Sequence, residues 1–102
     1  MIARHWRGWT TLRNAGPYEA LLQSKVLPKL KDVAGYHGGY ILRRNTEDEA
    51  EFIVVNLFDS IEAVKRFAGP EYEVAVFEPE ARLLLSRVEP LAAHYEVRAS
   101  TV

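Results

Sequence analysis

The 102-residue sequence contains no cysteine. This absence excludes disulfide bonds, thiolate nucleophiles, and zinc or iron–sulfur sites with cysteine ligands. The sequence also lacks a long apolar run, and Met1 is not followed by the apolar core of a signal peptide. We therefore expect no contact with a membrane and a cytoplasmic location.

The sequence also has no excess of positive or negative charge. Thirteen basic and fourteen acidic residues give a formal net charge of -1. A nucleic-acid-binding domain usually carries a clear basic excess, and so does a segment that binds an anionic membrane surface. The balance therefore predicts no nucleic acid among the partners.

Several local motifs of catalysis are absent as well. His5, His37 and His94 are far apart, and none has the i, i+4 spacing of a zinc site, so no metal site is predicted. There is no GxSxG turn for a nucleophilic serine and no GxxxxGK phosphate loop. The glycines between Gly35 and Gly39 are best interpreted as a turn.

The clearest structural signal is a strand that runs directly into a helix. Phe52 to Phe58 is almost wholly apolar and rich in β-branched and aromatic residues, which is typical of a strand buried on both faces. Asp59 precedes Glu62 by three residues, so the sequence predicts a capping box with a helix that begins at Ser60. Gly69-Pro70 should end that helix.

The N-terminal half predicts a strand, a helix and a hairpin. Ile2 to Thr10 mixes aromatic and basic residues, as expected for a strand beside a partly polar site. A helix is expected from Pro17, with a kink or restart near Leu27 because Pro28 cannot donate its amide. Tyr40 to Leu42 should pair with the apolar strand as a hairpin.

The C-terminal part predicts short irregular helices over residues 71–86 and a last strand from Ala92 to Ala99. The resulting order is β-α-β-β-α-β in a single domain spanning residues 1–102. This order indicates an α+β, ferredoxin-like fold with an antiparallel sheet and helices on one face. The other face then needs cover, and a homodimer is the expected partner.

The sequence also resembles the antibiotic biosynthesis monooxygenase family of the dimeric α+β barrel superfamily. The resemblance rests on the segment Gly35 to Arg43 and on the spacing of residues around the second helix. It implies a barrel built by two sheets in a dimer, with a pocket between sheet and helices in each subunit. Members include cofactor-free oxygenases of aromatic polyketides and haem-degrading enzymes. The spaced positions are Phe58, Ser60, Glu62, Ala63, Phe67 and Tyr72.

The chain departs from this family at three of those positions. Members commonly carry tryptophan at the position of Phe58 and histidine at those of Phe67 and Tyr72. Both imidazoles are therefore missing here. A haem ligand is disfavoured, because phenylalanine cannot bind iron and tyrosine is a less common axial ligand.

The candidate site lies on the first and last strands. If Arg4, Trp6 and His94 face the helices, His94 could take a phenol proton while Arg4 holds the oxyanion and Trp6 stacks on the ring. Asn56 and Tyr72 are weaker candidates for substrate binding. In the alternative interpretation, His94 only bonds to a neighbouring strand, Trp6 is core, and Arg4 pairs with Glu96.

Three functions fit these observations. The first is a cofactor-independent monooxygenase acting on a small phenolic or quinone-like aromatic, with no cofactor and no metal. The second is a module of the same fold that binds a small aromatic ligand without converting it. The third is a structural dimer with no cavity.

Overall fold

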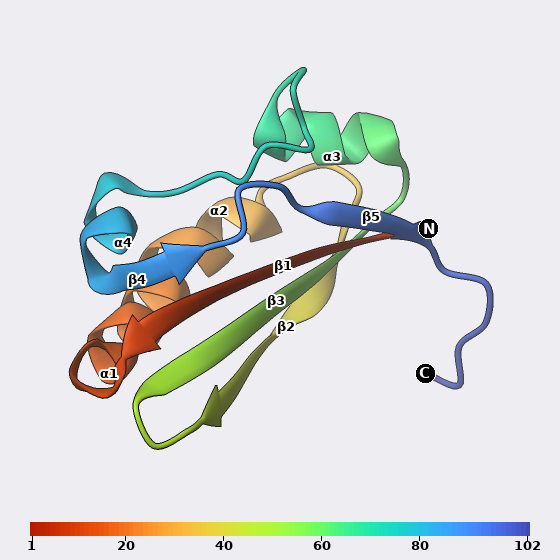
Figure 1. The fold of residues 1–102 in the computed structure, drawn as a ribbon. Coiled ribbons are helices and arrows are strands. Elements are labelled where there is room, and N and C mark those ends of the chain that lie inside the picture. Colours follow the sequence, from red (N-terminus) through yellow and green to blue (C-terminus); the bar gives the residue numbers. More distant parts are fainter.

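The computed structural model, which describes residues 1–102, is an α+β fold with one five-stranded antiparallel sheet and helices on one face (Figure 1). The strand order is β2-β3-β1-β4, and β5 also pairs with β1. This arrangement confirms the expected ferredoxin-like layout. The strands are β1 (Ile2–Thr11), β2 (Tyr36–Asn45), β3 (Glu49–Phe58), β4 (Leu85–Val88) and β5 (Ala93–Glu96). The helices are α1 (Leu12–Leu21), the π-helical turn η1 (Leu22–Val26), α2 (Leu27–Lys31), α3 (Ile61–Ala68) and α4 (Pro79–Leu84).

The first helix starts earlier than predicted. It begins at Leu12, because the Thr11 hydroxyl caps it by accepting a hydrogen bond from the Asn14 amide at 3.2 Å. Pro17, the expected start, lies inside the helix. The predicted restart near Leu27 is confirmed, since the π-helical turn precedes α2.

The helix that follows the apolar strand is capped by Ser60 and not by Asp59. The Ser60 hydroxyl accepts a hydrogen bond from the Ala63 amide at 3.2 Å. The Asp59 carboxylate instead pairs with His37. The predicted end is correct, because Gly69 follows the helix with a φ of 86° that favours glycine.

The last strand is broken into two pieces. Residues 85 and 86, the end of the segment expected to be helical, instead begin β4, and the strand expected over Ala92–Ala99 is the shorter β5. The break occurs because the chain between the pieces pairs with the segment after α3. The Ala92 amide donates to the Glu73 carbonyl at 2.7 Å, and the Ala75 amide donates to the Pro90 carbonyl at 3.0 Å.

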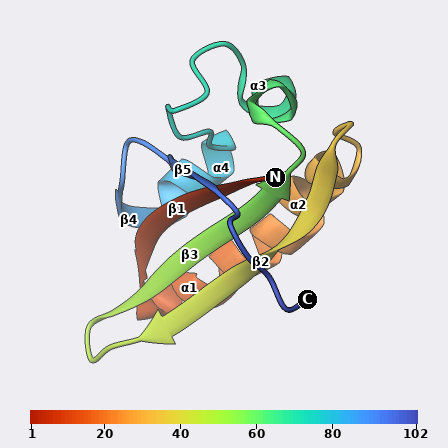
Figure 2. The same ribbon diagram turned by 90° about the vertical axis from the view of Figure 1, so that its right-hand side faces the viewer.

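The two faces of the sheet differ in cover. Helices and the segment after α3 bury the inner face, whereas no helix lies on the outer face (Figure 2). On that outer side Tyr40 is 60% exposed and Leu42 is 48% exposed. The strand Phe52–Phe58 is therefore covered by its own chain on one side only. No helix is long and apolar enough to cross a membrane.

We predict that Phe58→Ala lowers the free energy of unfolding by about 3–5 kcal/mol. Phe58 is fully buried and packs edge-on against Tyr36, with ring centroids 5.5 Å apart. Urea denaturation measures the change. Leu83→Ala is the control, because this exposed side chain should change stability by less than about 0.5 kcal/mol. A loss below about 1 kcal/mol for Phe58→Ala would contradict its place in the core.

Candidate functional site

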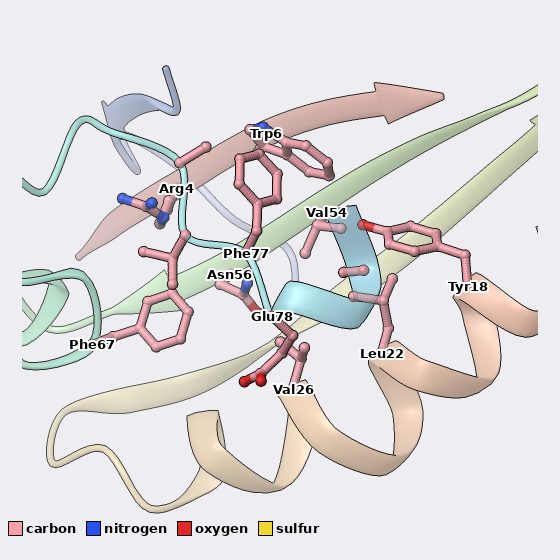
Figure 3. Close-up of a pocket in the computed structure, with 13 residues that line it drawn as sticks. Arg4, Trp6, Tyr18, Leu22, Val26, Val54, Asn56, Phe67, Phe77 and Glu78 are labelled. Atoms are coloured by element: carbon pink, nitrogen blue, oxygen red, sulfur yellow. The ribbon is translucent and has the colours of Figure 1, made fainter. Parts of the chain in front are cut away.

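A small cavity lies between the inner face of the sheet and the helices (Figure 3). Its volume is about 60 Å³, and its lining is mostly apolar. The sheet contributes Arg4, Trp6, Val54 and Asn56; the helices contribute Tyr18, Leu22, Val26, Phe67 and Ala81; the remaining wall is residues 75–78.

The structure brings three of the predicted site residues onto the cavity wall. These are Arg4, Trp6 and Asn56. Arg4 lies opposite Asn56 in β3 and opposite His94 in β5. The strand register therefore sets Arg4, Asn56 and His94 side by side. His94 and Tyr72 do not line the cavity. They line a separate open hollow of about 440 Å³, where their rings meet edge-on with centroids 5.0 Å apart.

Arg4 is a buried cation without a carboxylate partner. Its side chain is held by Nη1 donating to the Tyr72 carbonyl and to His94 Nε2 at 3.0 Å, and by Nη2 donating to the Val74 carbonyl at 3.3 Å. The residue is 5% exposed, and no salt bridge includes it. Burial lowers the pKa of Arg4 to about 10, so it remains protonated at neutral pH. An arginine has five N–H donors, and these contacts use only three of them.

His94 is a neutral acceptor in this arrangement. Burial lowers its pKa first, the charge of Arg4 lowers it further, and Glu73 opposes both effects. Because Arg4 donates to Nε2, the imidazole proton resides on Nδ1. The Nε2 lone pair, which a general base would need, is therefore engaged by Arg4.

The Asn56 carboxamide is oriented by two features that the sequence did not reveal. Its Oδ1 accepts a hydrogen bond from the Tyr36 hydroxyl at 2.9 Å. Gly39 makes room for that group, because a Cβ there would lie 2.4 Å from Asn56 Oδ1. With the oxygen held, the Nδ2 donor is the part of the carboxamide left for the cavity.

Trp6 is both a core residue and a wall of the cavity. Its indole Nε1 donates to the Glu89 carbonyl at 2.7 Å, and its ring meets Phe77 edge-on at 5.5 Å. The ring also lies over Gly8, where a Cβ would come within 2.3 Å of it. This indole is therefore fixed before any ligand arrives.

Sequence reasoning missed several lining residues, notably Tyr18, Phe67, Phe77 and Glu78. Tyr18 is a buried residue of α1 and was not among the predicted site residues. Phe77 lies in a segment expected to be helical, but residues 75–78 form neither helix nor strand and cover the cavity as extended chain. The chain takes this path because it pairs with residues 90–92, and no local sequence pattern predicts that pairing.

Comparison with solved structures supports the fold. A Bacillus cereus protein named as an antibiotic biosynthesis monooxygenase superposes with a TM-score of 0.62 at 16% identity, covering 99% of this chain and 94% of its own. The heme-degrader MhuD from Mycobacterium tuberculosis, solved with two hemes bound in its active site, superposes with a TM-score of 0.63 at 17% identity. That match covers all of both chains. The chain thus has the fold of antibiotic biosynthesis monooxygenases. No protein-family model and no curated protein sequence matches it.

Haem does not fit the cavity of this chain. No histidine lines the cavity, so it offers no imidazole to the iron. The only tyrosine on the wall is Tyr18, and burial raises the pKa of its hydroxyl, which disfavours the phenolate that would bind iron. No cluster of three histidine, aspartate or glutamate side chains could hold another metal ion.

We predict that His94 makes the protein sensitive to mild acid. A lowered pKa means that the unfolded chain binds a proton first as the pH falls below the ordinary value of 6.5. Stability contributed by neutral His94 is complete above pH 6.5 and is lost as the pH falls through the lower folded pKa. Urea denaturation at pH 7.5 and pH 5 should show a smaller loss for His94→Gln than for wild type. Equal losses would contradict the prediction.

Proposed function

We propose that this protein binds a small planar aromatic as its anion and oxidises it with dioxygen, without a cofactor. One observation carries the proposal: Arg4 places an uncompensated positive charge on the wall of an apolar cavity. The carbonyls of Tyr72 and Val74 and the His94 imidazole offer dipoles to this cation, but no carboxylate balances its charge. A phenolate or enolate oxygen would supply the missing charge.

The chemistry follows from stabilising that anion. Donors on Arg4 and on Asn56 Nδ2 would lower the pKa of a bound hydroxyl or acidic C–H group. The resulting anion is electron-rich and can reduce dioxygen itself. For an anthrone-like substrate, one oxygen atom becomes the new carbonyl oxygen, the other leaves as water, and the substrate supplies both hydrogens.

The proposed role of His94 is to position Arg4. Its Nε2 accepts from Arg4 Nη1, and it does not line the cavity. A proton transfer from a ligand directly to His94 would first have to break that hydrogen bond. Trp6 and Phe77 would pack against the ring of the ligand, while Tyr72 holds Arg4 through its backbone carbonyl.

Binding requires the cavity to widen. A volume of about 60 Å³ is below the roughly 150 Å³ of a cavity known to hold benzene. We propose that residues 75–78 move, because they are the part of the wall that belongs to no helix or strand. Movement of this segment would admit a ligand without disturbing the sheet.

A carrier that binds the same ligand without converting it is the second candidate. This candidate is favoured because the His94 Nε2 lone pair already accepts a hydrogen bond from Arg4. No free imidazole is therefore left beside the ligand to act as a base. The two candidates share Arg4 and differ in oxygen consumption.

We predict that wild type consumes oxygen with anthrone in the absence of flavin, nicotinamide and metal. Arg4→Gln should lower the rate by about 10²–10³-fold, the usual effect of removing a group that stabilises a developing anion. Arg13→Gln is the control, because Arg13 is an exposed arginine away from the cavity. Circular dichroism must show that both variants are folded.

Isotopic labelling separates the two candidates. With ¹⁸O₂, one labelled atom should appear in the anthraquinone product. Anthrone binding with no uptake above the uncatalysed rate would favour the carrier. Equal rates for Arg4→Gln and wild type would contradict the role of Arg4.

We also propose that the outer face of the sheet pairs with a second copy of the chain. Apolar side chains cluster there on β2 and β3, including Leu42, Ile53 and Val55, and no helix covers them. Exposed patches of this kind usually mark an interface. Sedimentation should give a species near twice 11.6 kDa. Val55→Lys should shift it toward the monomer, and a monomeric wild type at micromolar concentration would refute the pairing.

A further inference from the structure

A surface groove adjoins the cavity and shares part of its wall. The groove has a volume of about 280 Å³. Four side chains line both spaces: Val26, Phe67, Val76 and Glu78. Because the two spaces share these side chains, their movement would join them into one site. The joined volume reaches the lower end of the range of about 300–1,000 Å³ typical of ligand pockets.

The groove carries an unbalanced positive charge. Its polar residues are Lys29, Arg66 and Glu78. Lys29 Nζ pairs with the Glu78 carboxylate. Arg66 donates to the Ala34 carbonyl at 2.9 Å and forms no salt bridge. One guanidinium therefore remains available to an anion, and a guanidinium can bind a carboxylate through two hydrogen bonds.

Glu78 occupies the boundary between the two spaces. Figure 3 shows its side chain at the same end of the cavity as Val26, with its carboxylate directed away from Trp6. Its negative charge is paired with Lys29, one of the two cations that an acidic ligand group would use. An acidic group of a ligand would therefore compete with Glu78 for Lys29.

We infer that the ligand of this protein is a planar aromatic with a hydroxyl at one end and an acidic group at the other. The inference rests on the function proposed above and adds the second group. The hydroxyl end lies in the cavity near Arg4 and Asn56. The acidic end lies in the groove, where it binds Arg66 and displaces Glu78 from Lys29.

The chain offers a matched control for Glu78. Glu80 pairs with Lys25 at 2.7 Å, so a second ion pair joins the same part of the chain to α4. Neither of its members lines the cavity or the groove. Glu80→Gln therefore removes a nearby ion-paired carboxylate without touching the proposed site.

The experiment compares two fluorescent probes, 6-hydroxy-2-naphthoate and 2-naphthol, which differ only in the carboxylate. Wild type should bind the naphthoate more tightly. Glu78→Gln should increase affinity for the naphthoate by roughly three- to fivefold, as expected for a partly exposed charge pair, and leave 2-naphthol unchanged. Glu80→Gln should change neither probe. Arg66→Gln should reduce the preference for the naphthoate.

Each other result overturns the inference. Unchanged binding of 2-naphthol shows that Glu78→Gln is folded, so the absence of a gain for the naphthoate then counts against the competing role of Glu78. If Glu78→Gln gained affinity equally for both probes, the substitution would have enlarged the site and would not have removed repulsion between Glu78 and the carboxylate of the probe. If wild type binds 2-naphthol as tightly as the naphthoate, the acidic end is wrong and the proposed function stands. If it binds neither probe, both fail.

Discussion

The cavity depends on the hydrogen bonds that the Arg4 guanidinium donates to the segment covering the sheet. Arg4 lies on the central strand β1 and binds the carbonyls of Tyr72 and Val74 in that segment. That segment is not held by apolar burial alone, since Val74 is 47% exposed and Val76 is 50% exposed. The same cation thus fastens the cover of the cavity and supplies its charge. The proposed ligand anion would stabilise the charge of Arg4 and, through Arg4, the covering segment.

This fastening also explains the broken edge strand. The covering segment bonds to residues 90–92 through Glu73 and Ala75, and those residues leave the edge of β1 to meet it. Trp6 stabilises the break, because its indole donates to the Glu89 carbonyl. The interruption between β4 and β5 is therefore part of the cavity wall, and a continuous strand would remove these bonds.

The sequence predicted what depends on local pattern and missed what depends on contacts between distant segments. The strand Phe52–Phe58, the end of its helix at Gly69 and the restart near Leu27 follow from apolar spacing, glycine and proline. Strand alternation likewise placed Arg4 and Trp6 on one face. The Tyr36–Asn56 bond and the position of Phe77 could not be predicted, because each depends on residues brought together only by folding.

The two faces of the sheet perform different tasks through alternate residues of the same strands. In β3, Val54 and Asn56 face the cavity, while Ile53 and Val55 face outward. An outer contact between two copies would hold β3 in place without touching the inner face. The part of the cavity wall without helix or strand, residues 75–78, lies on the helix side of the sheet. If the cover opens as proposed, the sheet would stay fixed and would keep Arg4 and Asn56 in position for the proposed ligand.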